Sequence, residues 1–322
     1  MKSISITCIS LLLIFGVSCN EDSVVPLAFE WTPSKFSKYG SGFFSFATGD
    51  DGLLYAFGYV DNQEGFHKFT GNTWETIVPL DWSKFNVQSF TVFKQHIYFA
   101  NESQGQRTLW RINGNDPEKV DYGNSINGVS HFNGKLIVAG NFLDAMNNSY
   151  GFALSDDGAT FTPVAPKQGN FLSYGYNLIK VNKKIFVRSG GNFNVYEFDG
   201  VELKDTGFSQ GINMIDAEYN FYTITYQDGS PEINKIVNSK PLKVGPSFKN
   251  VQIDNIFFKD NILIAMGTNP DSNLSVAFYL DNNQWKPITT TNYLSRVFEY
   301  GNQSFAVDND GIILELSRQL YD

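Results

Sequence analysis

Residues 135–138 read Lys-Leu-Ile-Val, a short apolar run that follows a polar turn, and runs of this kind decide the fold. Short β-branched or aromatic segments bounded by Gly, Asn or Asp are typical of β-strands. The same pattern recurs six more times, at residues 53–56, 96–99, 184–187, 220–223, 261–264 and 304–307. Beyond residue 19, long segments with the 3.6-residue apolar spacing of a helix are missing. The chain is therefore predicted to be all-β.

The seven runs are regularly spaced along the chain. Measured from Leu54 in the first run to Phe305 in the last, equivalent residues of neighbouring runs are 36 to 49 positions apart. One blade of a β-propeller takes about 40 to 50 residues in the known repeat families. A further short strand precedes each run and is expected to line a central channel, while a third and usually a fourth strand follow. The spacing predicts a seven-bladed β-propeller, with six or eight blades left open because residues 212–245 fit the pattern least.

Tight turns join the outer strands of several repeats. Gly or Asn occupies the turns within residues 69–74, 198–203 and 280–285, and both residue types tolerate the positive φ of hairpin turns. Together with residues 136–142, Leu-Ile-Val-Ala-Gly-Asn-Phe, these segments resemble the kelch-like repeats of bacterial surface propellers and of the central domain of galactose oxidase. The resemblance covers most of residues 41–318 and implies the same propeller fold.

The two ends of the sequence are predicted to close the ring. The last repeat supplies strands at residues 296–300, 304–307 and 312–317, one strand short of a full blade. Residues 27–32, Leu-Ala-Phe-Glu-Trp-Thr, form a strand candidate that has no repeat of its own. Pairing this strand with the last repeat would remove the exposed edges that an open array of sheets presents.

The first residues predict export and a lipid anchor. Lys2 precedes an apolar run that is too short to cross a bilayer, which takes roughly 20 residues, so residues 1–18 are predicted to be a signal peptide. Residues 16–19, Gly-Val-Ser-Cys, resemble the lipobox of bacterial lipoproteins, with Gly16 in place of the usual Leu. The resemblance implies cleavage before Cys19 and its acylation, followed by a tether at 19–26 and a propeller domain at 27–322. An ordinary signal peptide cleaved elsewhere is the alternative.

Residues 20–23 and the overall charge indicate where the protein is located and which class of partner is disfavoured. Residues 20–23, Asn-Glu-Asp-Ser, resemble the export signal of surface lipoproteins of the Bacteroidetes. The resemblance implies an outer-membrane protein exposed at the cell surface, with the periplasmic face as the alternative. The chain has 24 Lys+Arg against 33 Asp+Glu, a net charge of −9. This acidic balance argues against nucleic acid as a partner.

Residues 155–161, Ser-Asp-Asp-Gly-Ala-Thr-Phe, resemble the Asp-box turn of sialidases and other propellers. In those families the box is a structural hairpin, and here too the Asp and Gly residues suit a turn. None of the five arginines belongs to a recognisable sialidase motif. We therefore expect a structural turn and no sialidase site.

The sequence does not predict a metal or a cofactor. His67, His96 and His131 lack the spacing of metal ligands, and the last two are expected on a blade surface or in the channel. The Asp-rich turns at residues 50–52 and 308–311 do not continue into a calcium loop. Copper-radical chemistry, known in some kelch-type propellers, needs a cysteine that the chain after Cys19 does not have.

The candidate ligand-binding residues lie in loops on one face of the predicted propeller. Loops that enter the inner strands, and loops between second and third strands, converge on the channel mouth, and loops of this kind often carry function. They contain aromatic side chains beside amides: Tyr59, Trp82, Phe142, Phe171, Tyr174, Phe193 and Tyr293, with Asn141, Asn170 and Asn192. Such groups suit sugar rings, which offer an apolar face and a rim of hydroxyls. Packing of these aromatics within the loops is the alternative.

Three functions are compatible with the sequence. We favour a surface lipoprotein whose propeller binds a glycan or a protein partner without catalysis, because no catalytic set is assembled. A glycoside hydrolase or lyase is the first alternative, with channel-mouth carboxylates such as Asp61, Glu64, Asp144 or Asp308 about 5 to 9.5 Å apart. The second alternative is a scaffold subunit of an outer-membrane assembly, which a large exposed apolar patch would favour. Fold alone does not choose among them.

Overall fold

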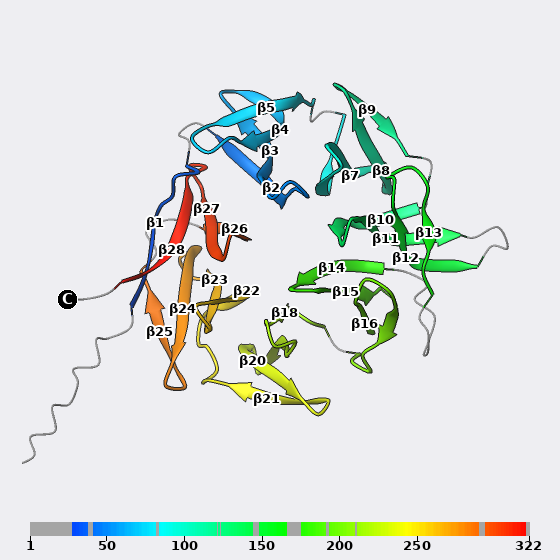
Figure 1. Cartoon of the computed structure of the whole chain (residues 1–322). Helices are drawn as coiled ribbons and strands as arrows, with labels where there is room; N and C mark the ends of the chain where they lie inside the picture. Colours follow the sequence, from blue (N-terminus) through cyan, green and yellow to red (C-terminus); the bar gives the residue numbers. More distant parts are fainter. Residues whose placement is uncertain are drawn as a thin grey trace, which may run out of the picture.

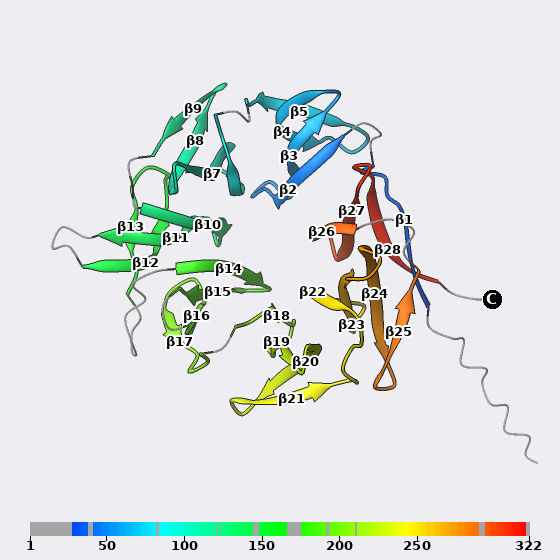
Figure 2. The ribbon, with the colours of Figure 1, turned by 180° about the vertical axis from the view of Figure 1, so that it is seen from behind.

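The computed structural model describes residues 28–37, 41–81, 84–120, 122, 124–143, 148–165, 175–190, 193–209, 211–289 and 294–319. The regular elements in these ranges are strands, β1 to β28, which form seven antiparallel four-stranded sheets. Figure 1 shows the sheets as blades around a central channel, and Figure 2 shows the same ring from behind. The predicted seven-bladed β-propeller is confirmed. In the described ranges, no helix is both long and apolar enough to cross a bilayer.

The first six blades have their strands in chain order from the channel outward (Figure 1). Blade one consists of β2 (Gly42–Thr48), β3 (Leu54–Val60), β4 (Gln63–Phe69) and β5 (Trp74–Pro79). Blade two consists of β6 (Val87–Phe93), β7 (His96–Ser103), β8 (Gln106–Asn113) and β9 (Asp116–Lys119). Blade three consists of β10 (Asn124–Phe132), β11 (Lys135–Leu143), β12 (Ser149–Ser155) and β13 (Thr162–Pro163).

The second half of the ring repeats this order. Blade four consists of β14 (Gly175–Val181), β15 (Lys184–Ser189), β16 (Val195–Phe198) and β17 (Leu203–Asp205). Blade five consists of β18 (Met214–Ile215), β19 (Phe221–Gln227), β20 (Ser230–Val237) and β21 (Lys240–Val244). Blade six consists of β22 (Gln252–Lys259), β23 (Ile262–Asn269), β24 (Leu274–Asp281) and β25 (Gln284–Ile288). Blade seven consists of β26 (Leu294–Tyr300), β27 (Gln303–Asp308), β28 (Ile313–Gln319) and β1 (Ala28–Pro33). The seven apolar runs of the sequence are the second strands.

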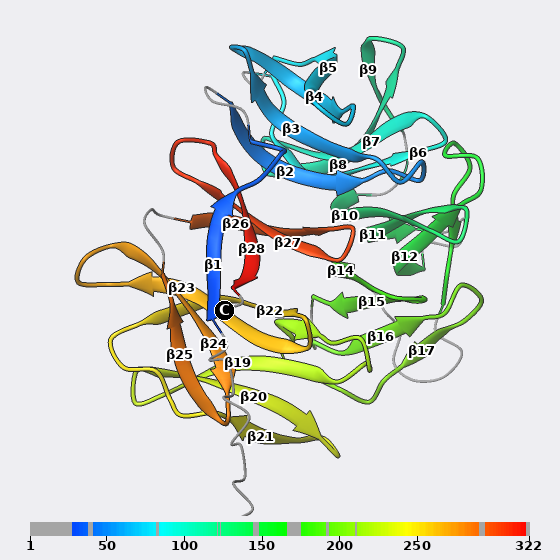
Figure 3. The ribbon, with the colours of Figure 1, turned by 60° about the vertical axis from the view of Figure 1, so that its left-hand side comes forward.

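The N-terminal strand closes the ring, as predicted. β1 pairs antiparallel with β28, with Trp31 opposite Leu316, and Figure 3 shows the two strands side by side. The same strand also touches blade six, where the rings of Phe29 and Tyr279 lie 5.3 Å apart in an edge-to-face contact. β1 therefore completes one blade and packs against its neighbour.

The hydrophobic core lies between neighbouring blades. Alternate side chains of each sheet face opposite ways, so both faces of a blade can pack against the next blade. Blade three and blade four, for example, meet through Phe152 and Phe198, whose ring centroids are 5.1 Å apart. Both side chains are fully buried, together with Ile137 and Tyr196 in the same cluster. A continuous apolar run is needed in the second strand, because that strand is buried on both faces.

Polar contacts also tie neighbouring inner strands together. The backbone N–H of Lys94 in blade two donates to Asp50 Oδ2 in blade one at 2.7 Å. The amide of Asn182 donates to the carbonyl oxygen of Ala217 at 2.9 Å, between blades four and five. The Tyr300 hydroxyl donates to the carbonyl oxygen of Gly52 at 3.1 Å, which joins blade seven to blade one. These bonds fix the distance between blades around the channel.

Two faces of the ring follow from the turns. We call the end with the turns between first and second strands the hairpin face, and the opposite end, where the chain enters each inner strand, the entry face. Short hairpin-face turns use positive φ at both central residues, as at Lys94-Gln95 and Asp260-Asn261. The predicted outer hairpins also form, with Phe69 opposite Trp74, Phe198 opposite Leu203 and Leu280 opposite Trp285.

The Asp-box segment forms a structural turn. Asp157 Oδ1 accepts hydrogen bonds from the backbone N–H groups of Ala159 at 2.8 Å and Thr160 at 2.7 Å, and from the Ser155 hydroxyl at 2.9 Å. These donors hold the pKa of the Asp157 carboxyl well below its usual range. The carboxylate is thus used inside its own hairpin, as expected.

β-Bulges recur near the entry-face end of the inner strands. A single extra residue interrupts the register at Phe44, Gln88, Asp254 and Arg296, and blades three and four are also irregular here. Gly58 and Gly267 stand opposite two of these bulges. Any larger residue would clash there, because a Cβ at Gly58 would lie 2.1 Å from the backbone oxygen of Gly42 and a Cβ at Gly267 would lie 1.8 Å from that of Gln252. Bulges re-aim side chains. We call Phe44, Gln88, Asp254 and Arg296 the bulge collar.

Candidate ligand site in the central channel

The largest cavity described lies in the channel itself. This channel cavity has a volume of about 740 Å³ and is lined by the inner strands of blades one to four and by Ile212 and Asn213 of blade five. Ligand pockets for small molecules typically have volumes of 300 to 1,000 Å³. Hydroxyl, amide and imidazole groups dominate the hydrogen-bonding part of its wall, among them Ser45, Gln88, Thr91, Asn127 and His131. The cavity is thus large enough for a small polar ligand.

A second cavity continues toward the hairpin face. This floor cavity has a volume of about 540 Å³ and is bordered by blades four to seven. It shares Lys180 and Asn213 with the channel cavity, so the two spaces meet at these residues. Glu299 and Lys259 line its other side. The two cavities together form a continuous path through one side of the ring.

His131 is held in place at the junction of blades two and three. Its Nδ1 lies 2.9 Å from the hydroxyl oxygen of Thr91, which is itself buried. Burial and the nearby charge of Lys180 lower the pKa of the imidazole, with Asp50 and Asp51 opposing this shift. His131 is therefore neutral at pH 7. When the Thr91 hydroxyl donates to Nδ1, the remaining nitrogen Nε2 carries the proton and is a hydrogen-bond donor.

Lys180 and Glu299, two charged groups of these cavities, differ in the opposite charges that lie near them. Lys180 and Glu299 are open to the water of the channel but surrounded by protein. Burial lowers the pKa of the Lys180 ammonium and raises the pKa of the Glu299 carboxyl. The charge of Lys259 partly offsets the shift of Glu299, whereas the one contact described for the Lys180 ammonium is a hydrogen bond to the His131 carbonyl oxygen at 3.4 Å.

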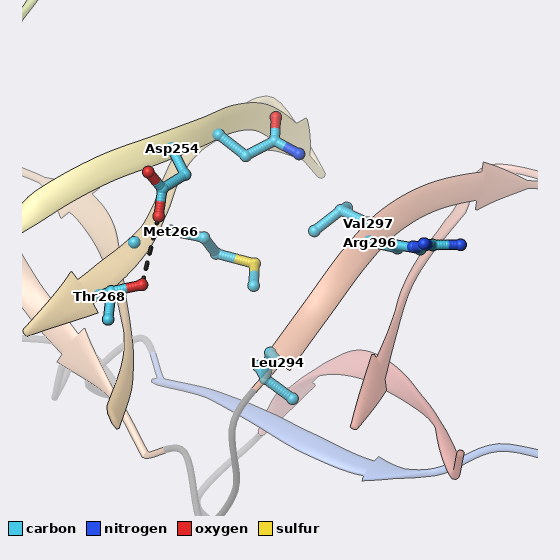
Figure 4. Close-up of a pocket in the computed structure, with 8 residues that line it drawn as sticks. Asp254, Met266, Thr268, Leu294, Arg296 and Val297 are labelled. Atoms are coloured by element: carbon cyan, nitrogen blue, oxygen red, sulfur yellow. Dashed lines mark hydrogen bonds between the residues drawn. The ribbon is translucent and has the colours of Figure 1, made fainter. Parts of the chain in front are cut away.

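A smaller pocket of about 260 Å³ lies between blades six and seven (Figure 4). Asp254 of the bulge collar lines it and accepts hydrogen bonds from Thr268 Oγ1 at 3.3 Å and from Gln252 Nε2 at 3.1 Å. Figure 4 shows the guanidinium of Arg296 directed away from Asp254. That guanidinium instead lies 5.1 Å from the ring centroid of Phe44, across the seam between blades seven and one. Arg296 and Phe44 of the bulge collar thus contact each other across this seam.

The predicted ligand face is only partly described. Tyr59 stacks edge-on against Phe44 at 5.6 Å, and burial together with a hydrogen bond to Glu64 raises the pKa of its hydroxyl. Asn141 accepts a hydrogen bond from the Ser149 hydroxyl at 2.8 Å. Phe193 has 47% of its side-chain surface exposed, with the Arg188 guanidinium 5.4 Å from its ring centroid. Neither the channel cavity nor the floor cavity is lined by these residues.

Phe142 corrects the expectation of an exposed aromatic platform. β11 extends to Leu143, so Asn141 and Phe142 belong to a strand and not to a loop. The Phe142 side chain is 0% exposed and stacks on Tyr122, with ring centroids 5.0 Å apart. It is therefore a core residue, and a substitution there would test folding and not ligand contact. The remaining predicted residues Cys19, Trp82, Asn170, Phe171, Tyr174, Asn192 and Tyr293 lie outside the described residues.

The described carboxylates named for a hydrolase, Asp61, Glu64 and Asp308, do not line the channel cavity. Asp308 is buried and accepts the backbone N–H groups of Asp310 at 2.9 Å and Ile312 at 2.8 Å. Asp61 occupies the positive-φ turn that leads to Glu64, and Asp144 lies outside the described residues. Among the residues that the structure describes, no group of three or more His, Cys, Asp or Glu side chains could hold a metal ion.

Comparison with known proteins gives a fold and no family. Neither a protein-family model nor a curated protein sequence matches the chain. The extracellular domain of a protein assigned to the one-component systems of B. thetaiotaomicron matches with a TM-score of 0.50 and 12% identity, over 90% of this chain and 40% of that one. A prolyl endopeptidase structure matches with a TM-score of 0.53 and 11% identity, over 89% and 51%. BamB from Moraxella catarrhalis matches with a TM-score of 0.48 and 12% identity, over 91% and 99%.

These likenesses show the propeller fold alone. The chain spans 40% of the length of the B. thetaiotaomicron extracellular domain and 51% of that of the endopeptidase chain. At 11% to 12% identity, no residue role is transferred from either protein. The chemistry of the site therefore rests on this chain's own side chains.

Sequence reasoning placed His131 on a blade surface or in the channel and missed Lys180 and Asn213. Lys180 and His131 each stand two residues before the hairpin-face turn of their blade, at Asn182 and Asn133. This shared position was the available signal, because equivalent positions of neighbouring blades come together in a ring. Asn213 lies in the least regular repeat and had no comparable signal.

Proposed function

We propose that the chain is a lipid-anchored surface lipoprotein whose propeller binds a glycan in its central channel, without catalysing a reaction on it. The observation that carries the proposal is the 740 Å³ channel cavity with its wall of hydroxyl, amide and imidazole groups. Sugar hydroxyls need several hydrogen-bonding partners at once, since each buried polar group left without a partner costs about 1 to 3 kcal/mol. A rigid ring of inner strands supplies such groups from several blades.

The anchor would leave the channel free. In this proposal residues 1–18 are removed, Cys19 is acylated, and residues 19–26 form the tether to the membrane. β1 is the outermost strand of blade seven, and its first residue Ala28 pairs with Gln319 at the hairpin-face end of β28. A tether attached there approaches the rim of the ring, so the entry face can point away from the bilayer. Two or more acyl chains would make such anchoring stable.

The first experiment separates binding from catalysis. The mature chain, produced with Cys19→Ser to keep it in solution, is applied to a glycan array and to immobilised polysaccharides, and released saccharides are measured in the same wells. Binding without release is expected, and it should fall at least tenfold in Asn127→Ala or His131→Ala. Saccharide release would instead favour the hydrolase or lyase alternative. The absence of both binding and saccharide release in every well would contradict glycan binding.

The second experiment tests the anchor and its location. Wild-type cells are expected to incorporate labelled palmitate into the protein, and Cys19→Ser cells are not. Protease added to intact cells should digest the wild-type protein if it faces outward. Resistance in intact cells with digestion after outer-membrane lysis would place it on the periplasmic face and overturn the surface location.

A protein partner is the second candidate, and one observation favours it. Blade five exposes apolar side chains on its second, third and fourth strands, with Tyr226 55%, Val237 41% and Leu242 59% exposed. Exposed apolar groups of this kind are often interaction sites when they form a continuous patch. Crosslinking in intact cells, followed by comparison of wild type with Leu242→Ser, tests whether a partner contacts this blade.

A further inference from the structure

The channel contains a cation that has no counter-charge in the part of the chain that the structure describes. Lys180 lines both cavities, and no described carboxylate lies within ion-pair distance of its ammonium. Other lysines of this region are paired, such as Lys184 with Glu197 at 2.8 Å and Lys259 with Asp260 at 3.8 Å. The Lys180 side chain is exposed to the water of the channel, so its charge is available to a ligand. A charged group that lines a cavity without a counter-charge is a candidate functional group.

The surroundings of Lys180 supply hydrogen bonds but little further charge. Its ammonium lies 3.4 Å from the backbone oxygen of His131, whose neutral ring is fixed by Thr91. Asn213 stands at the same junction of the two cavities, and its Oδ1 is already used by the backbone N–H of Ile224 at 2.8 Å. The Asn213 amide therefore offers its N–H donors. One cation beside two neutral hydrogen-bonding groups suits a singly charged anion.

The acidic groups nearby set the limit on ligand charge. Glu299 lines the floor cavity, and Asp50 and Asp51 act electrostatically on His131. A dianion such as a phosphate ester would place its second charge in the field of these carboxylates, while Lys259, which also lines the floor cavity, is already paired with Asp260. A single carboxylate would be matched one to one.

We infer that the channel selects acidic sugars, with the ligand carboxylate paired to Lys180 and neighbouring hydroxyls bonded to His131 and Asn213. This inference rests on the proposed function, because it names the class of glycan that the channel takes. It deepens that proposal in one respect: it predicts a preference for a carboxylate over the same sugar without a charge. A tenfold preference corresponds to about 1.4 kcal/mol.

The test compares saccharides that differ only in the carboxyl group. Oligomers of galacturonate, glucuronate and mannuronate, together with sialyllactose, are titrated calorimetrically into the full mature chain in detergent. Each is matched by its carboxyl-reduced counterpart, or by lactose for sialyllactose. At least one acidic member is expected to bind ten times more tightly than its neutral partner. Lys180→Met should abolish this ratio while leaving the affinity for the neutral partner within twofold.

Lys183→Met is the matched control. Lys183 lies three residues further on, in the turn of the same hairpin, is exposed, and lines neither cavity. This variant should keep the full preference. Both variants should keep the wild-type melting temperature, because both side chains are exposed and the only hydrogen bond described for the Lys180 side chain is long at 3.4 Å.

Each outcome decides a separate question. Equal binding of acidic and neutral sugars by wild type overturns the inference and leaves glycan binding intact. A preference that survives in Lys180→Met also overturns it, since another cation would then be responsible. Failure of every saccharide to bind overturns both the inference and the proposed function.

Discussion

Blades five and six stand side by side in the ring and share one topology, yet they meet the channel in different ways (Figure 1). The inner strand of blade six, β22, has eight residues and a bulge at Asp254. The inner strand of blade five, β18, has two residues and no register shift. The second strand is well formed in both blades, so it specifies a blade, whereas the inner strand shapes the channel.

The short inner strand of blade five borders the candidate site. Asn213 borders both the channel cavity and the floor cavity, and residues 214–217 line the floor cavity. A side chain replaces backbone pairing at this point, because Asn213 Oδ1 accepts the N–H of Ile224. The repeat that fits the sequence pattern worst thus contributes Asn213, a residue at which the two cavities meet. Substitutions in the two blades test whether their second strands and inner strands differ in this way.

The largest expected difference concerns the second strands. Ile264 of blade six is 0% exposed, and Ile264→Ala should lower the free energy of unfolding by about 2 to 5 kcal/mol, because it leaves a cavity between blades six and seven. Ile224 of blade five is only partly buried, so Ile224→Ala should cost less than half as much. Urea denaturation followed by circular dichroism measures both. Equal losses would show that blade five is packed as tightly as blade six.

The next effect concerns the glycine opposite the bulge of blade six. A Cβ at Gly267 would lie 1.8 Å from the backbone oxygen of Gln252, so Gly267→Ala must push the two strands apart. Forced overpacking of this kind costs about 1 to 3 kcal/mol. Gly211→Ala, beside the inner strand of blade five, is the control, because no atom lies within 4 Å of its Cβ position. It should change the free energy of unfolding by less than about 0.5 kcal/mol. A silent Gly267→Ala would contradict the bulge geometry.

The sequence predicted the part of the fold that depends on local pattern. Each second strand is buried on both faces, so it requires an apolar run such as Leu136-Ile137-Val138, and the spacing of those runs gave the blade number. Ring closure by residues 28–33 was predictable for the same reason: the last repeat lacked a partner for its outer edge. These features follow from burial and turn chemistry alone.

The candidate site was less predictable, because it depends on register. Because β11 extends to Leu143, Phe142 lies in the core and not in the expected loop. A bulge shifts which side chains face the channel, and no local residue pattern marks the bulges at Phe44 or Arg296. Lys180 looks like an ordinary strand lysine until its neighbours across the channel are known.

A smaller effect is expected for Asn213 of blade five, whose side chain takes the place of a backbone hydrogen-bond partner. Asn213→Ala removes the acceptor of the Ile224 N–H and should lower the free energy of unfolding by about 1 kcal/mol. Asn213→Asp keeps an acceptor at the same position and should restore most of that loss. Amide hydrogen exchange at Ile224 gives a local readout, with faster exchange expected in Asn213→Ala only. Unchanged exchange would mean that the side chain does not replace strand pairing.

The smallest effect concerns His131, which faces the cavity that blade five leaves open. Burial, and then the charge of Lys180, lower the pKa of its imidazole, while an unfolded chain would titrate near the ordinary value of about 6.5. The unfolded state therefore binds the proton more readily, so this contribution to stability is fully present above pH 6.5 and is lost as the pH falls through the folded-state pKa. The melting temperature of wild type should fall more between pH 7 and pH 5.5 than that of His131→Asn, which can keep a hydrogen bond to Thr91. Parallel pH profiles of the two proteins would show that His131 titrates as it does in the unfolded chain, and that the channel is open to bulk water at this point.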